Sequence, residues 1–129
     1  MNVHEDMREL IKKINPDRWK VFQAMLRPGE NDGISELLVS ESEFMDYSKR
    51  NMFTLENGTK PRFENNNDMR PSYLMLDPQG RFFHSVNGPI EYIETNPLNI
   101  ANSKNEIVFD YDAYIRRGGV YNWERENNR

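Results

Sequence analysis

The sequence predicts an α/β fold, with α+β character if the piece is taken alone, in a single unit of 129 residues. Three observations lead to this prediction. An amphipathic helical pattern lies near the start, a nearly continuous apolar run of strand length follows it, and a tight-turn hairpin lies in the second half. A chain of this length forms one ordinary domain or part of one.

Composition indicates a folded chain that has little apolar material for a core of its own. Apolar residues make up 36% and the mean hydropathy is -0.91, whereas the apolar share of soluble domains approaches about half. Aromatic residues still make up 12%, and a disordered chain carries fewer. We therefore expect a piece that packs against another part of a protein.

Charge and residue content exclude several classes of function. The net charge of -4 and the pI of about 5.2 argue against a nucleic-acid polymer as partner, since such binders carry a basic footprint. Cysteine is absent, which removes disulfides, iron–sulfur ligation and cysteine nucleophiles from this chain. His4 and His84 are too far apart for a metal motif, so no metal site is predicted. No apolar run is long enough to span a bilayer and no signal peptide is visible, so a cytoplasmic location is expected.

Residues 5–14 predict the first helix, because apolar side chains recur at the spacing of one helical face. Pro16 ends this helix, since the residue before a proline avoids the helical region. Residues 18–26 then predict a strand. Alternation along this strand places Arg18, Lys20 and Phe22 on one face.

The two cations on that face have two interpretations. On spacing alone, a solvated strand edge is favoured, because charged side chains deter edge pairing. The alternative is a phosphate clamp, since the fork of Arg18 and the point charge of Lys20 together suit a polyphosphate.

The middle of the chain predicts one helix and one hairpin. Residues 34–39 allow either a strand or a helix, and Ser40 can cap a helix over 41–50 through a capping box. Residues 51–71 are polar and predict a loop. A hairpin follows over 72–86, with strands on either side of a turn that Asp77 begins.

The last part of the chain predicts little regular structure. Residues 87–105 are rich in Asn and predict an irregular segment, and Asp110 can cap a short helix over 111–117. Gly118 and Gly119 would end that helix. Little order is expected beyond residue 120.

Two further groups are candidates for chemistry, each with a structural alternative. Arg116, Arg117, Gly118 and Gly119 form either an ordinary helix C-terminus or a Gly-rich nest that closes over an anion, and capping is favoured on sequence alone. Tyr73 is most simply a core or sheet residue, and a catalytic role would require its hydroxyl to face a ligand.

Three strings of residues, taken together, resemble the C-terminal part of the viperins. They are Asn-Pro-Asp-Arg-Trp-Lys-Val-Phe-Gln at 15–23, Ser-Tyr-Leu-Met-Leu-Asp at 72–77 with Arg81-Phe82, and Arg-Arg-Gly-Gly-Val-Tyr-Asn-Trp at 116–123. The first string carries most of the specificity, and the others support it by order and spacing.

The resemblance implies the C-terminal portion of a partial (βα) radical S-adenosylmethionine barrel. Residues 1–50 would end the barrel, 51–71 would be a loop, 72–86 a hairpin, and 87–129 a C-terminal extension and lid. Viperins convert a nucleoside triphosphate to its 3′-deoxy-3′,4′-didehydro antiviral analogue, a lyase-type dehydration. The implied partners are a nucleoside triphosphate and the remainder of the barrel.

The resemblance also implies roles for particular residues. Arg18 and Lys20 would contact the triphosphate, and Tyr73 would lie near the ribose and complete the hydrogen-atom chemistry. The lid segment that orders over the nucleotide would contain Arg116, Arg117, Gly118 and Gly119.

The family's three-cysteine motif lies upstream of the matched region, and this chain has no cysteine. S-adenosylmethionine and the [4Fe–4S] cluster would therefore belong to the parent enzyme, and the chain alone would be inactive. The alternatives are a stand-alone nucleotide-binding module without chemistry or a small protein-interaction domain.

Overall fold

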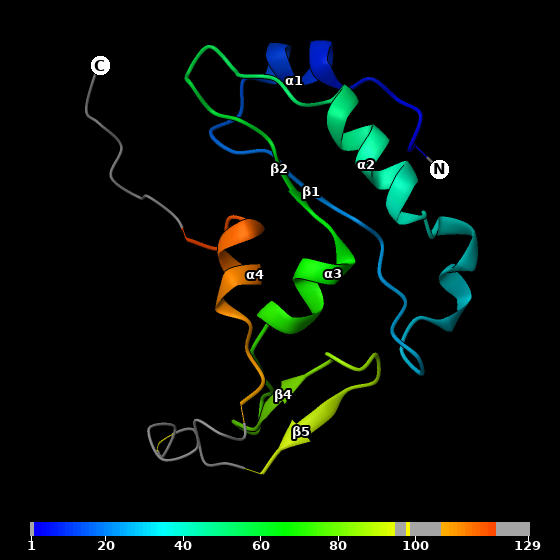
Figure 1. The fold of residues 1–129 in the computed structure, drawn as a ribbon, viewed down its shortest axis with the longest axis vertical. Helices are drawn as coiled ribbons and strands as arrows, with labels where there is room; N and C mark the ends of the chain where they lie inside the picture. The colour runs from blue at the N-terminus through cyan, green and yellow to red at the C-terminus, as the bar shows by residue number, and fades with distance from the viewer. Residues whose placement is uncertain (1, 95–97, 99–106, 121–129) are drawn as a thin grey trace.

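The computed structural model describes residues 2–94, 98 and 107–120. The chain is a mixed α/β structure in which short helices accompany two small sheets (Figure 1). In chain order its elements are α1 (Arg8–Ile14), β1 (Lys20–Phe22), the 3-10 helix η1 (Asp32–Leu37), α2 (Glu41–Arg50), β2 (Arg62–Glu64), α3 (Asn66–Met69), the 3-10 turn η2 (Arg70–Ser72), β3 (Met75–Leu76), β4 (Phe82–His84), β5 (Glu91–Ile93) and α4 (Tyr111–Arg116).

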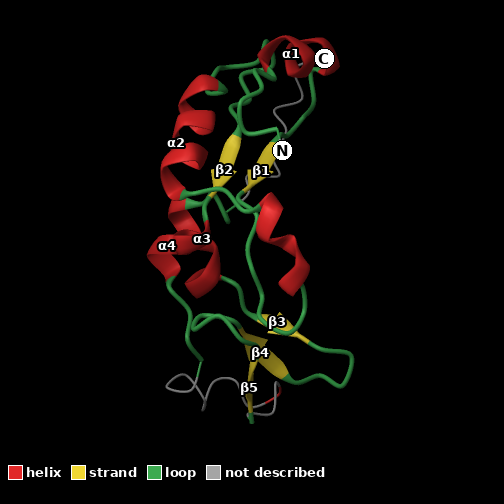
Figure 2. Ribbon diagram, turned by 90° about the vertical axis from the view of Figure 1, so that its right-hand side faces the viewer, coloured by secondary structure: helices red, strands yellow, loops and turns green. Residues whose placement is uncertain are grey.

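The first sheet is a parallel pair, β1 and β2, with Val21 opposite Phe63 and Phe22 opposite Glu64. Parallel neighbours need a crossover connection, and here the crossover carries α2, which lies along one side of the pair (Figures 1 and 2). Successive side chains of β1 and β2 therefore point alternately towards α2 and towards the rest of the molecule.

The core on the α2 side is aromatic, and Phe63 lies at its centre. Its ring contacts those of Trp19, Phe44 and Tyr47 with centroids 6.1 to 6.4 Å apart in edge-on geometry, which aromatic quadrupoles favour. Burial raises the pKa of Tyr47. These contacts fix β2 against α2 and so set which face of the strand pair is turned away from the helix.

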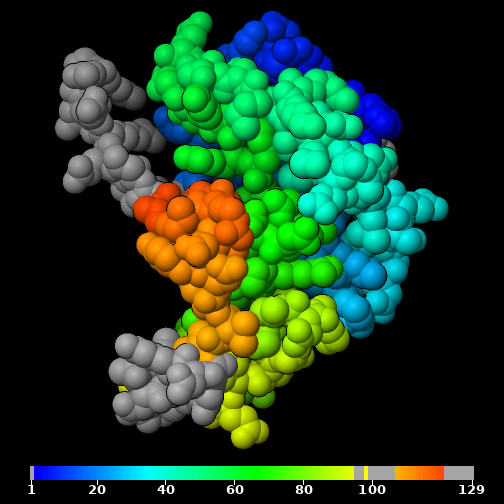
Figure 3. All heavy atoms as spheres, viewed as in Figure 1, coloured from blue at the N-terminus to red at the C-terminus, as the bar shows by residue number. Residues whose placement is uncertain are grey.

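The second sheet is antiparallel, in the order β3-β4-β5, and lies at the other end of the molecule (Figure 2). Between the two sheets, α4 packs directly against α3 and η2, as the space-filling view shows (Figure 3). This contact brings the end of α4, near residue 117, beside the strand pair β1–β2.

Several predicted elements are confirmed. Helix α2 begins at Ser40 with both halves of the capping box formed by Glu43. Helix α4 begins at Asp110, whose carboxylate accepts the backbone N–H of Ala113, and Asp77 begins the hairpin turn, accepting the Gly80 N–H at 2.9 Å. Helix α1 ends before Pro16 as predicted, although it begins only at Arg8.

Other predictions are wrong in extent or type. The strand predicted over 18–26 is only Lys20–Phe22, because its partner β2 ends at Glu64, where Asn65 caps α3. The hairpin strand predicted over 72–77 is only Met75–Leu76, so Tyr73 lies in the extended segment before it.

Two segments predicted to be irregular contain regular structure. The segment 51–71, predicted to be a loop, contains β2, α3 and the start of η2, and the segment 87–105 contains β5. Both strands are three residues long and exist because a neighbour supplies their hydrogen bonds. The segment 34–39, open between strand and helix, is largely the 3-10 helix η1. The expectation of little order over 121–129 lies outside the described residues. Among the residues that the structure describes, no helix is long and apolar enough to cross a membrane.

Candidate functional site

The centre of the candidate site is Glu64, the last residue of β2, which is completely buried. It lies on the face of the strand pair turned away from α2, the same face as Lys20. Its carboxylate forms ion pairs with Lys20 and with Arg117, whose Nη1 lies 3.1 Å from Oε2. A buried carboxylate is tolerated only when it is paired in this way.

Tyr73 joins the same carboxylate from the segment that follows η2. Its hydroxyl donates to Oε2 of Glu64 at 3.1 Å, and the guanidinium of Arg117 stacks on its ring at 4.0 Å. Burial raises the pKa of Tyr73, and the negative charge of Glu64 raises it further, while the charges of Arg117 and Lys20 lower it. The hydroxyl is thus held protonated at neutral pH.

Arg117, the residue at the C-terminal end of α4, is buried and donates through three of its nitrogens. Besides the bond to Glu64, Nε donates to the Ser72 hydroxyl at 2.6 Å and Nη2 to the Ser72 carbonyl at 2.9 Å. The guanidinium also lies 5.0 Å from the ring of Tyr114. Arg117 therefore ties the end of α4 to η2 and to Tyr73.

Gly118 and Gly119 end α4 in a Schellman motif. The Gly118 N–H donates to Ile115 and the Gly119 N–H to Tyr114, and Gly118 has the left-handed φ of 74° that this motif requires. The predicted capping role is confirmed. Both N–H groups are used by the helix carbonyls, so in this conformation they do not form an anion nest.

Arg18 reaches the same turn from the segment just before β1. Its Nη2 lies 3.4 Å from the carbonyl oxygen of Gly118. The face predicted to carry Arg18 and Lys20 is therefore the face that meets the end of α4. Arg116 points elsewhere, because its Nε pairs with Asp68 at 2.9 Å and its side chain is 57% exposed.

Comparison with known proteins finds relatives along most of the chain. No protein-family model matches the chain. The chain is 38% identical to the S-adenosylmethionine-dependent nucleotide dehydratase of Flammeovirga pacifica, over 95% of this chain and 42% of the relative. It is 36% identical to S-adenosylmethionine-dependent nucleotide dehydratase RSAD2 of Oncorhynchus mykiss, over 99% of this chain and 38% of the relative.

The chain is thus similar to S-adenosylmethionine-dependent nucleotide dehydratases along nearly its whole length. A relative from Lacinutrix mariniflava carries the same dehydratase name and is 30% identical over 100% of this chain and 27% of its own length. The resemblance inferred from the three strings is thereby confirmed. The chain spans less than half the length of each of these relatives.

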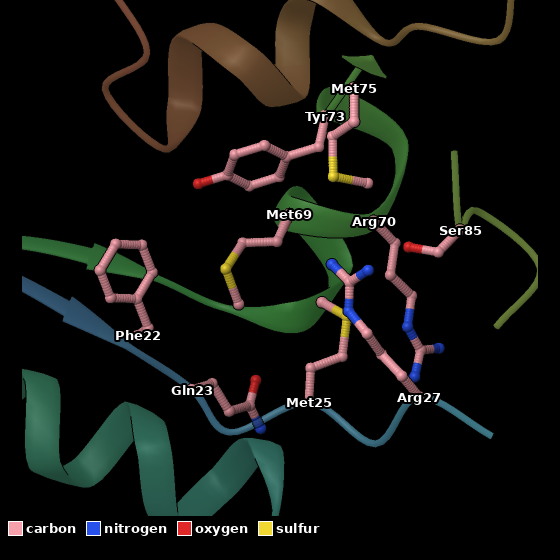
Figure 4. A pocket seen from close by; sticks show the side chains of 9 residues that line it. All are labelled: Phe22, Gln23, Met25, Arg27, Met69, Arg70, Tyr73, Met75 and Ser85. Carbon is pink, nitrogen blue, oxygen red and sulfur yellow. The ribbon is translucent and has the colours of Figure 1, made fainter. Parts of the chain in front are cut away.

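Tyr73 also lines a cavity of about 270 Å³. Figure 4 shows the ring of Tyr73 at its wall, with Phe22 opposite and two arginines at the far end. Most of the lining is apolar, and it includes Met25, Met69 and Met75. Tyr73 therefore borders both the charged cluster and an apolar cavity.

Two other polar side chains near the site, Asn65 and His84, lie in regular secondary structure or cap it. The Asn65 side chain caps α3 by accepting the Asp68 N–H, so the three asparagines at 65–67 begin a helix. His84 is buried in β4. Among the described residues no cluster of His, Asp and Glu could hold a metal ion.

Sequence reasoning missed Glu64, the residue that connects the site. The segment around it was predicted to be a loop, and a loop carboxylate is normally solvated. The only local signal is the alternation of Arg62, Phe63 and Glu64, in which one apolar residue lies between two charged ones. That pattern is too short to predict a strand without its partner.

Proposed function

We propose that this chain is the nucleotide-binding portion of an S-adenosylmethionine-dependent nucleotide dehydratase. In this proposal it is the C-terminal portion of a partial (βα) barrel, and the whole enzyme converts a nucleoside triphosphate to its 3′-deoxy-3′,4′-didehydro analogue. The parallel pair β1–β2 with its helical crossover is compatible with such a barrel, and the names of the relatives support the reaction class.

One observation carries the proposal. Lys20, Tyr73 and Arg117 come from segments far apart in the sequence and meet at Glu64, and Arg18 reaches the adjoining turn at Gly118. These residues are among those that the resemblance selects, and their proximity supports a shared role in binding the nucleotide.

Each residue has a proposed role that its chemistry can perform. Arg18 and Lys20 bind the triphosphate, because a guanidinium fork and an ammonium group are strong phosphate donors. Arg116, Arg117, Gly118 and Gly119 form the segment that covers the nucleotide. Tyr73 places its hydroxyl beside the ribose.

The residues present do not fit the metal cofactor of such an enzyme. Thiolates ligate iron–sulfur clusters, and this chain contains no cysteine. In the proposal, the cluster and S-adenosylmethionine are therefore held by the remainder of the barrel. What this chain supplies is binding and orientation of the nucleotide.

Calorimetric titration of the 129-residue chain with nucleoside triphosphates tests the binding role. Arg18→Ala should weaken triphosphate affinity, because a hydrogen bond to a charged group contributes about 1.5–3 kcal/mol, or roughly ten- to a hundredfold. Lys49→Ala is the matched control, since Lys49 is a highly exposed cation on α2. Equal affinity of the wild-type chain and Arg18→Ala would contradict the clamp.

The catalytic part of the proposal is tested in the longer polypeptide that contains this chain. Incubation with S-adenosylmethionine, a reductant and a nucleoside triphosphate should give a nucleotide that has lost one water, detected by mass spectrometry. Triphosphate binding without such a product would favour the alternative of a binding module that performs no chemistry.

A further inference from the structure

We infer that Glu64 is the positioning residue of this site, whose carboxylate fixes the hydroxyl of Tyr73 relative to the phosphate-binding cation Lys20. This inference rests on the proposed function and adds a residue to it. Glu64 touches no substrate in this role. It acts through Tyr73, Lys20 and Arg117.

The contacts of the two carboxylate oxygens carry the inference. One oxygen of Glu64 pairs with Lys20, and the other accepts from Tyr73 and Arg117, each at 3.1 Å. The three partners come from β1, from the segment after η2 and from the end of α4. A single buried group therefore sets the distance between the cation on β1 and the phenol after η2.

Burial explains why this connection is rigid. Glu64 is 0% exposed, so the carboxylate has no solvent to turn towards and must keep its protein partners. The guanidinium of Arg117 lies on the face of the Tyr73 ring while the hydroxyl is bound at its tip. Both the plane of the ring and the direction of the hydroxyl are fixed.

A purely structural role would be served better by other residues. Replacing a buried ion pair by apolar side chains of similar volume is often neutral or stabilising. The cluster lies instead where the proposed phosphate and ribose contacts meet, and Tyr73 also borders the cavity (Figure 4). Positioned groups must hold their geometry closely, since a displacement of about 1 Å can cost on the order of a hundredfold in rate.

The pKa of Tyr73 can be measured, and it responds to the charge of Glu64, which a packing role alone would not require. Burial and the negative charge of Glu64 both raise the pKa of Tyr73, whereas Arg117 and Lys20 lower it. Glu64→Gln keeps the size of the side chain and removes its charge. The pKa of Tyr73 should then fall, because the two cations remain and favour the phenolate.

The experiment follows tyrosine ring-carbon resonances of the 129-residue chain by NMR across a pH series, with Tyr73 assigned through Tyr73→Phe. Glu64→Gln should lower the pKa of Tyr73, and Glu64→Asp, which keeps the charge, should restore much of the difference. Asp68→Asn is the matched control, because Asp68 pairs with Arg116 instead. An unchanged Tyr73 pKa in folded Glu64→Gln would overturn the inference.

A second variant applies if Glu64→Gln does not fold. Lys20→Gln removes a charge that lowers the Tyr73 pKa, so the shift should have the opposite sign, upward. A downward shift, or none, would contradict a connected cluster.

The titration needs no nucleotide, so the proposed function and the positioning role of Glu64 can be refuted independently of each other. A Tyr73 pKa that depends on Glu64, in a chain that binds no triphosphate, would refute the proposed function alone. Triphosphate binding with a Tyr73 pKa that does not depend on Glu64 would refute the positioning role alone.

In the longer polypeptide, Glu64→Gln should lower kcat on the order of a hundredfold with a smaller change in KM. Equal losses in binding and turnover, without rescue by Glu64→Asp, would indicate a structural role.

Discussion

At the scale of single residues, the site depends on close approaches that only particular side chains allow. Gly119 is the sharpest case. A Cβ built at this position would lie 2.2 Å from the ring of Tyr114, and the Tyr114 hydroxyl donates to the Gly119 carbonyl. The second glycine of the pair is therefore required by packing, while Gly118 is required by its backbone conformation.

Gly119→Ala should destabilise the chain by about 1–3 kcal/mol, because overpacking forces side chains and backbone to shift. Urea unfolding followed by circular dichroism measures the difference. Gly33→Ala is the control, since Gly33 has ordinary backbone dihedrals and nothing within 4 Å of an added Cβ. If both variants unfold at the same urea concentration, the contact with Tyr114 is not a constraint.

The sequence predicted some of these residues and not others, for a physical reason. Arg18, Lys20, Tyr73 and Arg117 were selected by resemblance, whereas spacing alone favoured structural roles for all of them. Glu64 could not be selected, because its importance comes from three partners that are distant in sequence. Contacts of that kind are set by tertiary structure.

At the scale of elements, the sequence predicts helices whose ends are marked by capping residues. It does not predict short strands that form only by pairing with a neighbouring strand. Helix α2 was predicted with its bounds because Ser40 and Glu43 cap it within a single turn. The strands β2 and β5 were missed because three residues carry no periodicity. Strand β2 exists through its pairing with β1 and the packing of Phe63.

The capping box of α2 gives a prediction at this scale. Ser40→Ala should destabilise the chain by about 1 kcal/mol, since an orphan N–H of the first turn loses its acceptor. Thermal unfolding measures the loss, with Ser35→Ala at an exposed position of η1 as control. Equal stability of the two variants would contradict the cap.

The same box makes part of the stability of α2 depend on pH. The backbone and hydroxyl of Ser40 donate to Glu43 and lower its pKa below the usual value. A carboxyl whose pKa is lower in the folded state stabilises it above the unfolded pKa, and this contribution is lost as pH falls through the folded value. The difference between wild type and Ser40→Ala should therefore shrink in acid.

At the scale of the whole molecule, the buried cluster joins the first sheet to the helical layer beside it. Strand β2 packs against α2 through Phe63, while α3, η2 and α4 lie between the strand pair and the second sheet (Figures 1 and 2). Glu64 belongs to the first group, and Ser72 and Arg117 to the second. Arg117 is thus a principal connection between α4 and the strand pair.

Adjacent arginines allow this connection to be tested within one helix end. Arg117→Ala should destabilise the chain by about 3–5 kcal/mol, because removing one partner leaves the buried Glu64 charge poorly compensated. Arg116→Ala should cost at most about 1 kcal/mol, since its ion pair with Asp68 is half exposed. Urea unfolding of both variants gives the comparison. Similar losses would mean that Arg117 does not hold the molecule together. A large loss confined to Arg117→Ala would show that the segment proposed to cover the nucleotide is anchored through Arg117, by its bonds to Glu64 and Ser72.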